Sequence, residues 1–175
     1  VPVSGINTLP ANDAVTGILP VNPDNAIITT LKNGLYSLSN KGIYELGSVN
    51  NTIFKNERIY AATAVNKDWI ALATNNNGVY ITDFRGNIIQ SFSQTEGLQN
   101  NNVLSIFSDS QRNLWLGLDN GIDLITYNSS IKQIKPLLQD GSGYTAILHD
   151  NRLFLGTSNG LFSVPVQPFP DMSFS

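Results

Sequence analysis

Side chains that commonly carry catalysis are sparse in this 175-residue chain. It contains no Cys and a single His, His149. Disulfides, thiolate metal sites and cysteine nucleophiles are therefore absent, and one His alone cannot build a zinc site. No pattern pairs His149 with a nucleophilic Ser. We expect no catalytic, metal-binding or cofactor-binding residues, and we expect His149, beside the acidic Asp150, to be a surface turn residue aligned with the acidic turn residues Asp68 and Asp109.

The acidic side chains suggest two further kinds of site, and neither is well supported. The run from Asp119 to Asp123 places oxygen ligands at short spacing but lacks the further ligands and the closing Glu of an EF-hand calcium loop. Glycoside hydrolysis needs two carboxylates about 5–9.5 Å apart. The scattered acids include Glu45, Glu96, Asp123 and Asp140, and no spacing singles out a pair. We interpret the run as a turn and predict no hydrolytic pair.

Aromatic side chains recur along the chain and could stack on sugar rings. Trp69 and Trp115 each follow a turn, and we assign them to the same repeat position. Tyr36, Tyr80 and Phe162 each lie two residues after a Gly. Because a position that repeats is more often a packing position than a binding one, we expect all five to pack.

Composition and charge narrow the class of protein. Hydrophobic residues make up 41%, charged residues 13%, and 10 Lys and Arg against 13 Asp and Glu give a net charge of −3. Such a chain can bury a core, and it has no basic excess for binding nucleic acid. No apolar run reaches the ~18 residues of a membrane span. The chain begins with Val1, so we expect a piece of a longer protein.

The elements that must position these residues are indicated by an internal repeat. An apolar run, a small or hydroxyl residue, an Asn-Gly pair and a second apolar run occur four times. The pairs are Asn33-Gly34, Asn77-Gly78, Asn120-Gly121 and Asn159-Gly160. Asn-Gly between apolar runs predicts a hairpin with a type I′ turn, in which both central residues have positive φ. The repeat also excludes a helix over Ala61–Leu72, because the equivalent positions of other repeats read as strands.

Each repeat contains four strands in ~40–45 residues, the size of a propeller blade. A strand precedes each hairpin, and a more polar fourth strand follows at Ile43–Leu46, Ile88–Phe92 and Ile131–Ile134. We predict an all-β chain, a β-propeller fragment of about four four-stranded antiparallel blades with the last blade incomplete. The expected divisions are 1–12 (a strand or linker that could close a ring), 13–49, 50–94 and 95–138 (blades), 139–166 (a three-stranded blade) and 167–175 (a linker to further repeats).

The stretch GLQNNNVLSIFSDSQRNLWLGLDNGIDLI, Gly97 to Ile125, resembles the two-component-regulator propeller repeats of Bacteroidetes-type sensors. The matching residues are Gly97, Leu98, Asn102, Val103, Asp109, Asn113, Leu114, Trp115 and Gly117. Leu118 replaces the usual Thr, and Ile122 and Asp123 depart from the pattern after Asn-Gly. The repeat ending near Val164 restores Gly156 and Thr157, and the first repeat is the most degenerate.

This resemblance covers residues 13–166 and implies a function. Such propellers are usually the periplasmic sensing part of a membrane-anchored regulator, followed by a triple-tyrosine β-sandwich, a membrane span and a histidine kinase or helix-turn-helix output; some sense oligosaccharides. It implies a non-catalytic domain that binds a small polar ligand and signals to an output domain outside this chain. The alternatives are a scaffold for protein–protein interaction and, less favoured, a propeller glycosidase or lyase.

The predicted arc does not close into a ring. If each bare end face is ~500 Å² of apolar surface, leaving it in water forgoes on the order of 12 kcal/mol, comparable with the whole stability of a domain. We therefore expect partners: the remaining blades of the parent propeller, or a second copy of the chain as a homo-oligomer. The spare strand Val1–Leu9 could complete a neighbouring blade.

Longer connections between blades are where ligand contacts are expected, since the repeat occupies the strands. They are Gly47–Asn56, Ser93–Asn102 and Gln139–Gly143, rich in Asn, Gln, Ser and Gly. These side chains can hydrogen-bond hydroxyl-bearing ligands, but turn formation explains the same composition. We therefore assign no ligand-binding residue, and we give little weight to the glycosylation sequons at Asn50 and Asn128.

Overall fold

A computed structural model describes residues 9–126 and 142–165 of the chain. It divides into two compact units, one ending at Ile125 and one beginning at Thr126, and each is considered by itself. The predicted strand Ile131–Ile134, the sequon at Asn128, Asp140, residues 1–8 and the linker 167–175 lie outside the described residues.

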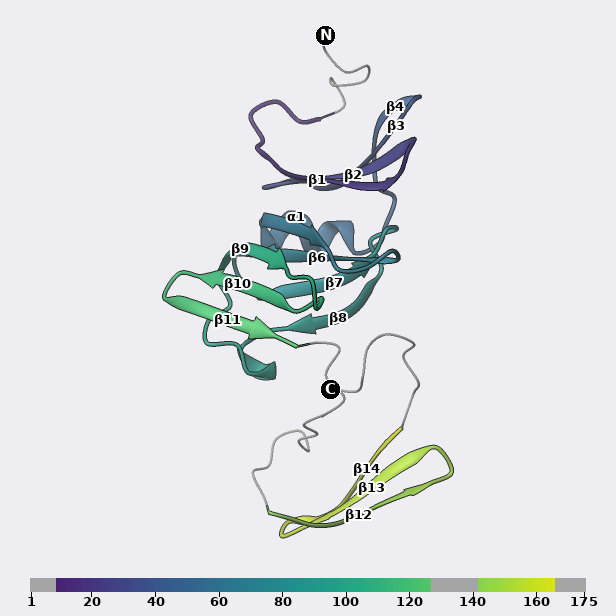
Figure 1. Ribbon diagram of the computed structural model, residues 1–175, viewed down its shortest axis with the longest axis vertical. Coiled ribbons are helices and arrows are strands. Elements are labelled where there is room, and N and C mark those ends of the chain that lie inside the picture. Colours follow the sequence, from purple (N-terminus) through teal and green to yellow (C-terminus); the bar gives the residue numbers. More distant parts are fainter. Residues whose placement is uncertain (1–8, 127–141, 166–175) are drawn as a thin grey trace. The chain divides into compact units, whose positions relative to one another are not determined.

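The first unit consists of three antiparallel sheets in chain order (Figure 1). The first has the order β1-β2-β3-β4, the second β5-β6-β7-β8, and the third has β10 between β9 and β11. The strands of the first two are β1 (Val15–Asn22), β2 (Asn25–Thr30), β3 (Gly34–Ser39), β4 (Gly42–Glu45), β5 (Ile59–Ala64), β6 (Trp69–Thr74), β7 (Val79–Asp83) and β8 (Ile88–Phe92). Those of the third are β9 (Val103–Ser108), β10 (Leu114–Leu118) and β11 (Gly121–Ile125).

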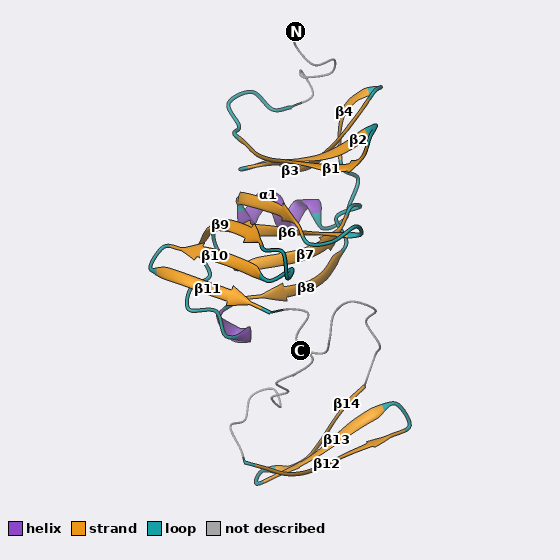
Figure 2. Cartoon of the chain, in the orientation of Figure 1, coloured by secondary structure: helices purple, strands orange, loops and turns teal. Residues whose placement is uncertain are grey.

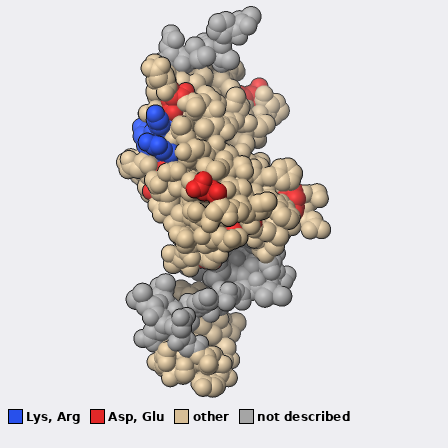
Figure 3. Space-filling view, turned by 90° about the vertical axis from the view of Figure 1, so that its left-hand side faces the viewer, with Lys and Arg blue, Asp and Glu red and all other residues tan. Residues whose placement is uncertain are grey.

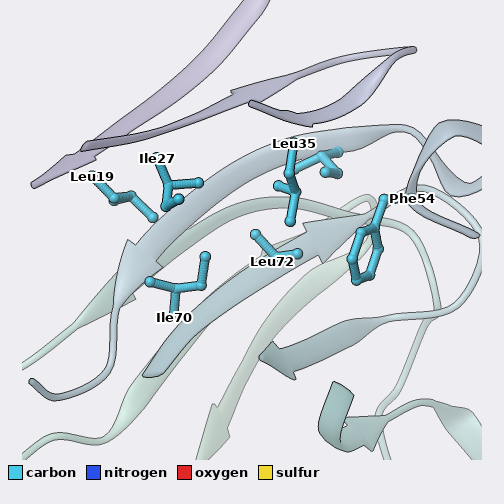
Figure 4. Close-up of a cluster of buried hydrophobic side chains, with 7 residues drawn as sticks. Leu19, Ile27, Leu35, Phe54, Ile70 and Leu72 are labelled. Carbon is cyan, nitrogen blue, oxygen red and sulfur yellow. The ribbon is translucent and has the colours of Figure 1, made fainter. Parts of the chain in front are cut away.

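These three sheets stack face to face, as blades do. β1 and β2 lie against β5, and β5 and β6 lie against β9. Between the first two sheets is a core of apolar side chains (Figure 4). Its buried members are Leu19, Ile27, Leu35, Phe54, Ile59, Ile70 and Leu72. On the other face of the first sheet, Ile28, Tyr36 and Ile43 form a smaller cluster with Leu9 and Leu38. The prediction of an all-β propeller fragment is confirmed.

Burial follows the position of each strand within its sheet. β6 is covered on both faces, and every residue after its first is buried. β8, at the sheet edge, is only partly buried. This difference explains why β6 is uniformly apolar while β8 contains Gln90 and Ser91. The expected strands over Ala61–Leu72 are also confirmed, as β5 and β6.

One connection differs from expectation. The segment Gly47–Asn56, predicted to be irregular, overlaps α1 (Asn51–Glu57), a seven-residue helix. The Phe54 ring is fully buried between the first two sheets and meets Tyr80 edge-on, with ring centroids 5.8 Å apart. A helix this short is marginal alone, so burial of Phe54 stabilises it. Neither α1 nor any other helix among the described residues has the length and hydropathy that crossing a membrane takes.

The described residues of the second unit, 142–165, form a three-stranded sheet. Its strands are β12 (Gly143–His149), β13 (Arg152–Thr157) and β14 (Gly160–Pro165), with β13 in the middle. Every residue of β12 is exposed, and β13 carries the partly buried run Leu153–Thr157. This sheet repeats the strand order of β9–β11 around its own Asn-Gly turn.

The two tryptophans do not share a repeat position. Trp69 opens β6, five residues before its last residue, whereas Trp115 lies three residues before the end of β10. Counted back from the last residue of each strand, Trp115 corresponds to Ala71. The assignment failed because the turns into β6 and β10 place the two rings at different distances from the strand ends. Trp69 is partly buried, but Trp115 is 44% exposed.

Candidate functional site

The Asn-Gly pairs lie in the turns between β2 and β3, β6 and β7, β10 and β11, and β13 and β14 (Figure 2). In all four the Gly has positive φ, as in Gly34 (+77°) and Gly78 (+70°), and none of the four Asn does. The predicted type I′ geometry is therefore wrong at these turns. It occurs instead between β12 and β13, where Asp150 (φ 47°) and Asn151 (φ 56°) are both left-handed.

A threonine hydroxyl closes three of these turns from inside. In the second repeat, the Thr74 hydroxyl donates to the Gly78 carbonyl (2.9 Å) and accepts from the Asn77 N–H (3.3 Å). Thr30 does the same in the first repeat, and Thr157 in the last. The third repeat has Leu118 at this position, so its turn lacks the hydroxyl.

A second contact joins each turn of the first unit to the segment entering its own sheet. The Asn33 amide donates to Asp13 Oδ2 (2.7 Å), and the Asn77 amide donates to Glu57 Oε1 (2.8 Å). In the third repeat the polarity is reversed, because Asn100 Nδ2 donates to Asn120 Oδ1 (3.0 Å). Each pair is separated by twenty residues. We call these contacts the turn clamps. In the sequence, the constant separation of the paired residues is the one signal that could have indicated them.

Burial and the turn clamps together shift the pKa values of two groups near the turns. Burial tends to raise the pKa of Asp13, but hydrogen bonds from the Asn33 side chain and the Lys32 backbone outweigh it and leave the pKa below its ordinary value. Burial raises the pKa of Tyr80, and the negative charge of Glu57 adds to this effect. Asp13 and Tyr80 thus remain carboxylate and phenol at neutral pH.

The connection Ser93–Asn102 is ordered by its own polar groups. Ser93 and Glu96 form a capping box around the 3₁₀ turn Gln94–Glu96. The Gln94 N–H donates to Asn101 Oδ1 (2.7 Å), and the Asn101 carbonyl accepts from the Gly78 N–H (2.8 Å). This predicted ligand-contacting connection therefore passes over the turn of the second repeat in a fixed conformation.

A second set of contacts ties the same connection to β11. Gln99 donates to the Asp123 carboxylate from its backbone N–H (2.8 Å) and from its side-chain amide (2.6 Å). Both hydrogen bonds hold the Asp123 carboxylate to Gln99. Of the run interpreted as a turn, Asp119 and Asn120 form the turn, whereas Asp123 lies within β11. Among residues 9–126 and 142–165, no three His, Cys, Asp or Glu side chains group as metal ligands.

Trp115 is oriented by an acidic turn at the opposite end of the β9–β11 sheet. Asp109 Oδ2 accepts from the indole Nε1 (3.0 Å), and Asp109 also accepts from the backbone N–H groups of Gln111 and Asn113. The hydrogen bond from the Trp115 indole is the largest effect on Asp109, and it lowers the pKa of this carboxyl. Trp115 and its strand neighbours Phe107 and Leu124 form an exposed apolar row.

The remaining candidates are spread over separate places. Glu45 pairs with Lys55, Glu96 belongs to the capping box, and His149 contacts Asp150 (3.4 Å) with both side chains exposed. Tyr36 and Tyr80 lie in apolar clusters, as expected, and Phe162 is partly buried in β14. Asn50 uses its side-chain amide to bind the Gly86 carbonyl.

Charge is sparse on the face shown in Figure 3. Lys and Arg gather at one place beside acidic groups, and the other acidic side chains are separated by uncharged surface. Uncharged amides and hydroxyls occupy the end of the first unit that carries the Asn-Gly turns, with Asn76, Asn77, Gln94, Thr95 and Asn120 exposed there. We call this end of the first unit the turn face. It offers amides and hydroxyls for hydrogen bonding, beside the exposed carboxylates of Glu96 and Asp119.

Comparison with known proteins confirms the predicted resemblance. Residues 97–120 match the family model described as "Two component regulator propeller". No curated protein matches the chain. The match spans β9 and β10 of the third sheet, the stretch where the residues Gly97 to Gly117 indicated the resemblance.

Solved structures show the same fold. The extracellular domain of the putative hybrid two component system BT4673 from B. thetaiotaomicron is 22% identical, with a TM-score of 0.55 over 93% of this chain. A structure described as the extracellular domain of the putative one component system BT4673 is 25% identical, with a TM-score of 0.51 over 96% of this chain. This chain spans 23% of the length of each of those two.

Proposed function

We propose that this chain is part of the periplasmic sensing region of a bacterial two-component or one-component regulator. In this role it binds a small polar ligand, without catalysing a reaction, and a change of shape or association is passed to an output domain outside the chain. Oligosaccharides are the ligand class we favour. A ligand can drive such a change only through different affinities for two states.

The match of residues 97–120 to the regulator propeller family carries this proposal. The similar solved structures are described as extracellular domains of regulatory systems, which supports an extracytoplasmic role. Both resemblances concern the arrangement of blades, so the choice of ligand class rests on the chemistry of the turn face.

The turn face suits a ligand rich in hydroxyl groups. Amides both donate and accept hydrogen bonds, and those of Asn76 and Gln94 are exposed there. The turn clamps and the capping box already hold the backbone beneath them. A preordered surface loses less conformational entropy when a ligand binds.

Calorimetric titration of the chain against a panel of neutral oligosaccharides tests the proposal. We expect heat from one class of glycan, and a several-fold weaker Kd when Asn76→Ala and Thr95→Ala are combined, because a neutral hydrogen bond contributes about 0.5–1.5 kcal/mol. Ser110→Ala at the opposite end of β9 is the matched control and leaves the Kd unchanged. An absence of heat from every glycan, in this chain and in the whole parent propeller, would contradict the proposal.

The outer face of the third sheet supports a second proposal, about partners. Phe107, Trp115, Ile122 and Leu124 are between 44% and 67% exposed on this face. Contiguous exposed apolar side chains mark interaction surfaces. We propose that the bare faces of the arc are covered by the remaining blades of the parent propeller or by a second copy of the chain.

If this surface instead docks a different protein, the chain is a scaffold. Sedimentation and affinity capture distinguish a protein-binding scaffold from a ligand-binding sensor. A scaffold retains a protein partner and gives no heat with glycans, and Trp115→Ser abolishes the capture. A sensor binds a glycan with or without Trp115.

A further inference from the structure

The Asn-Gly pairs of the first unit place a reactive amide beside a backbone nitrogen. The Gly nitrogen can attack the Asn side-chain carbonyl carbon, because no Cβ shields it. A new C–N bond forms, the side-chain nitrogen leaves as ammonia, and a cyclic imide results. Water then adds to either imide carbonyl and gives Asp or isoaspartate. One water is consumed, one ammonia is released, and nothing is oxidised.

In two of the three turns, hydrogen bonds of the Asn side chain oppose this reaction. The amide nitrogens of Asn33 and Asn77, which would leave, donate to the carboxylates of Asp13 (2.7 Å) and Glu57 (2.8 Å). In the second turn the attacking nitrogen is also engaged, because the Gly78 N–H donates to a backbone carbonyl. Both glycines are buried. The side chain cannot rotate toward the Gly nitrogen without breaking a charge-assisted hydrogen bond.

The third turn differs in the exposure of its Gly and in the direction of its turn clamp. Asn120 and Gly121 are exposed, and Leu118 provides no hydroxyl to hold the Asn120 N–H. The turn clamp here donates to the side-chain carbonyl oxygen of Asn120 instead of accepting from its nitrogen. Negative charge develops on that oxygen when the Gly nitrogen attacks, and a positioned N–H donor stabilises such charge. Asn100 therefore favours the reaction that Asp13 and Glu57 oppose.

We propose that Asn120 is a site of spontaneous self-modification, which cyclises onto Gly121 in the folded protein and opens to Asp or isoaspartate. The product places a new carboxylate between Asp119 and Asp123. Repulsion of Asp123 weakens its hold on Gln99, so the connection Ser93–Asn102 loosens. The modification therefore changes the charge of the turn face, and the inference does not depend on which ligand binds there.

Peptide mapping by mass spectrometry of the full chain, aged at mildly alkaline pH, tests this proposal. We expect Asn120 to convert at least about ten times faster than Asn33 and Asn77, a factor that corresponds to about 1.4 kcal/mol of activation free energy. In denaturant the three rates should converge, since each Asn precedes Gly.

Two reciprocal variants test the role of the turn clamp. Asn100→Asp supplies a carboxylate that can accept from the Asn120 amide and keeps the oxygen that binds the Asn102 N–H, so conversion of Asn120 should slow toward that of Asn33. Asp13→Asn should speed conversion of Asn33. Urea midpoints of both variants show whether unfolding contributes. Equal rates at the three sites in the folded chain, or rates that neither substitution changes, would overturn the proposal.

Discussion

The second and third sheets are built on the same repeat but differ in what covers them. Ala71, Ala73 and Val79 of the second sheet are fully buried, because the third sheet lies against them. The corresponding residues of the third sheet are Trp115, Gly117 and Ile122, and both Trp115 and Ile122 are exposed. The inner face of the third sheet is buried as in its neighbour, with Leu114 and Leu116 at 0% exposure.

This difference shows that a blade is completed by its neighbours. The inner strands are apolar on both faces and need a sheet on each side. The second sheet has both within the first unit, whereas only one side of the third is covered there. The stability of each blade is therefore expected to depend on its place in the arc, as in other repeat proteins.

The largest expected contrast comes from truncating side chains on the two sheets. Leu72→Ala removes a fully buried side chain from the main core and should lower the free energy of unfolding by about 2–5 kcal/mol. Trp115→Ala removes a side chain that is 44% exposed and should cost clearly less. Urea unfolding of both variants measures the contrast, and equal losses would mean that the outer face of the third sheet is as well packed as the core.

Glycine substitutions sharpen the same comparison. A Cβ on Gly78 would lie 2.0 Å from the Phe92 carbonyl oxygen, whereas the nearest atom to a Cβ on Gly121 is 3.5 Å away, in Gln99. Since Gly78 also has a φ of +70°, Gly78→Ala should destabilise by about 2–3 kcal/mol or more. Gly121→Ala should cost less. A smaller effect at Gly78 in thermal or urea unfolding would argue against the close approach.

The threonine hydroxyl inside the turn also distinguishes the second sheet from the third, because the third repeat has Leu118 at this position. Thr74→Val leaves the Asn77 N–H without the hydroxyl, and it leaves the Gly78 carbonyl with the backbone N–H of residue 74 as its donor. We expect a loss of about 1–3 kcal/mol in unfolding free energy. Thr95→Val, on an exposed position, is the control. If Thr74→Val were neutral, the hydroxyl bridge would not stabilise the turn.

Acidification should weaken the first turn clamp but not the third. The pKa of Asp13 is lowered in the folded state, so its contribution is present above the unfolded pKa of about 3.9 and is lost as pH falls through the lower folded value. Because Asp13 is largely solvated, the effect should be at most about 1 kcal/mol. Urea midpoints between neutral and strongly acidic pH should converge for the wild type and Asp13→Asn; a constant difference would exclude this role.

Much of the fold follows from local signals, and the failures come from contacts between distant residues. The spacing of the Asn-Gly pairs located the hairpins because each pair needs a Gly of positive φ. The turn type was wrong at all four pairs, including the third, which has no threonine hydroxyl, because only the Gly of each pair takes a positive φ. No propensity indicates α1 within a polar connection, since burial of Phe54 by two sheets stabilises it.

The polar groups of the turn face were predicted by composition, but their roles were not. Asn100 and Asp13 look like ordinary loop residues, and only folding brings each to an Asn twenty positions later. Trp115 was expected to pack because its position recurs. The sheet register instead places it opposite Leu124 on a face that is open in the first unit.

Double-mutant cycles on the turn clamps test most directly whether the repeats are equivalent units. The pairs are Asp13 with Asn33 and Glu57 with Asn77, each changed to Ala singly and together, with unfolding free energy as the measure. The account predicts coupling of similar sign and size in both pairs, near 1 kcal/mol for partly exposed charge-assisted hydrogen bonds. Coupling below the ~0.3–0.5 kcal/mol seen for independent sites, in either pair, would contradict a repeated structural unit.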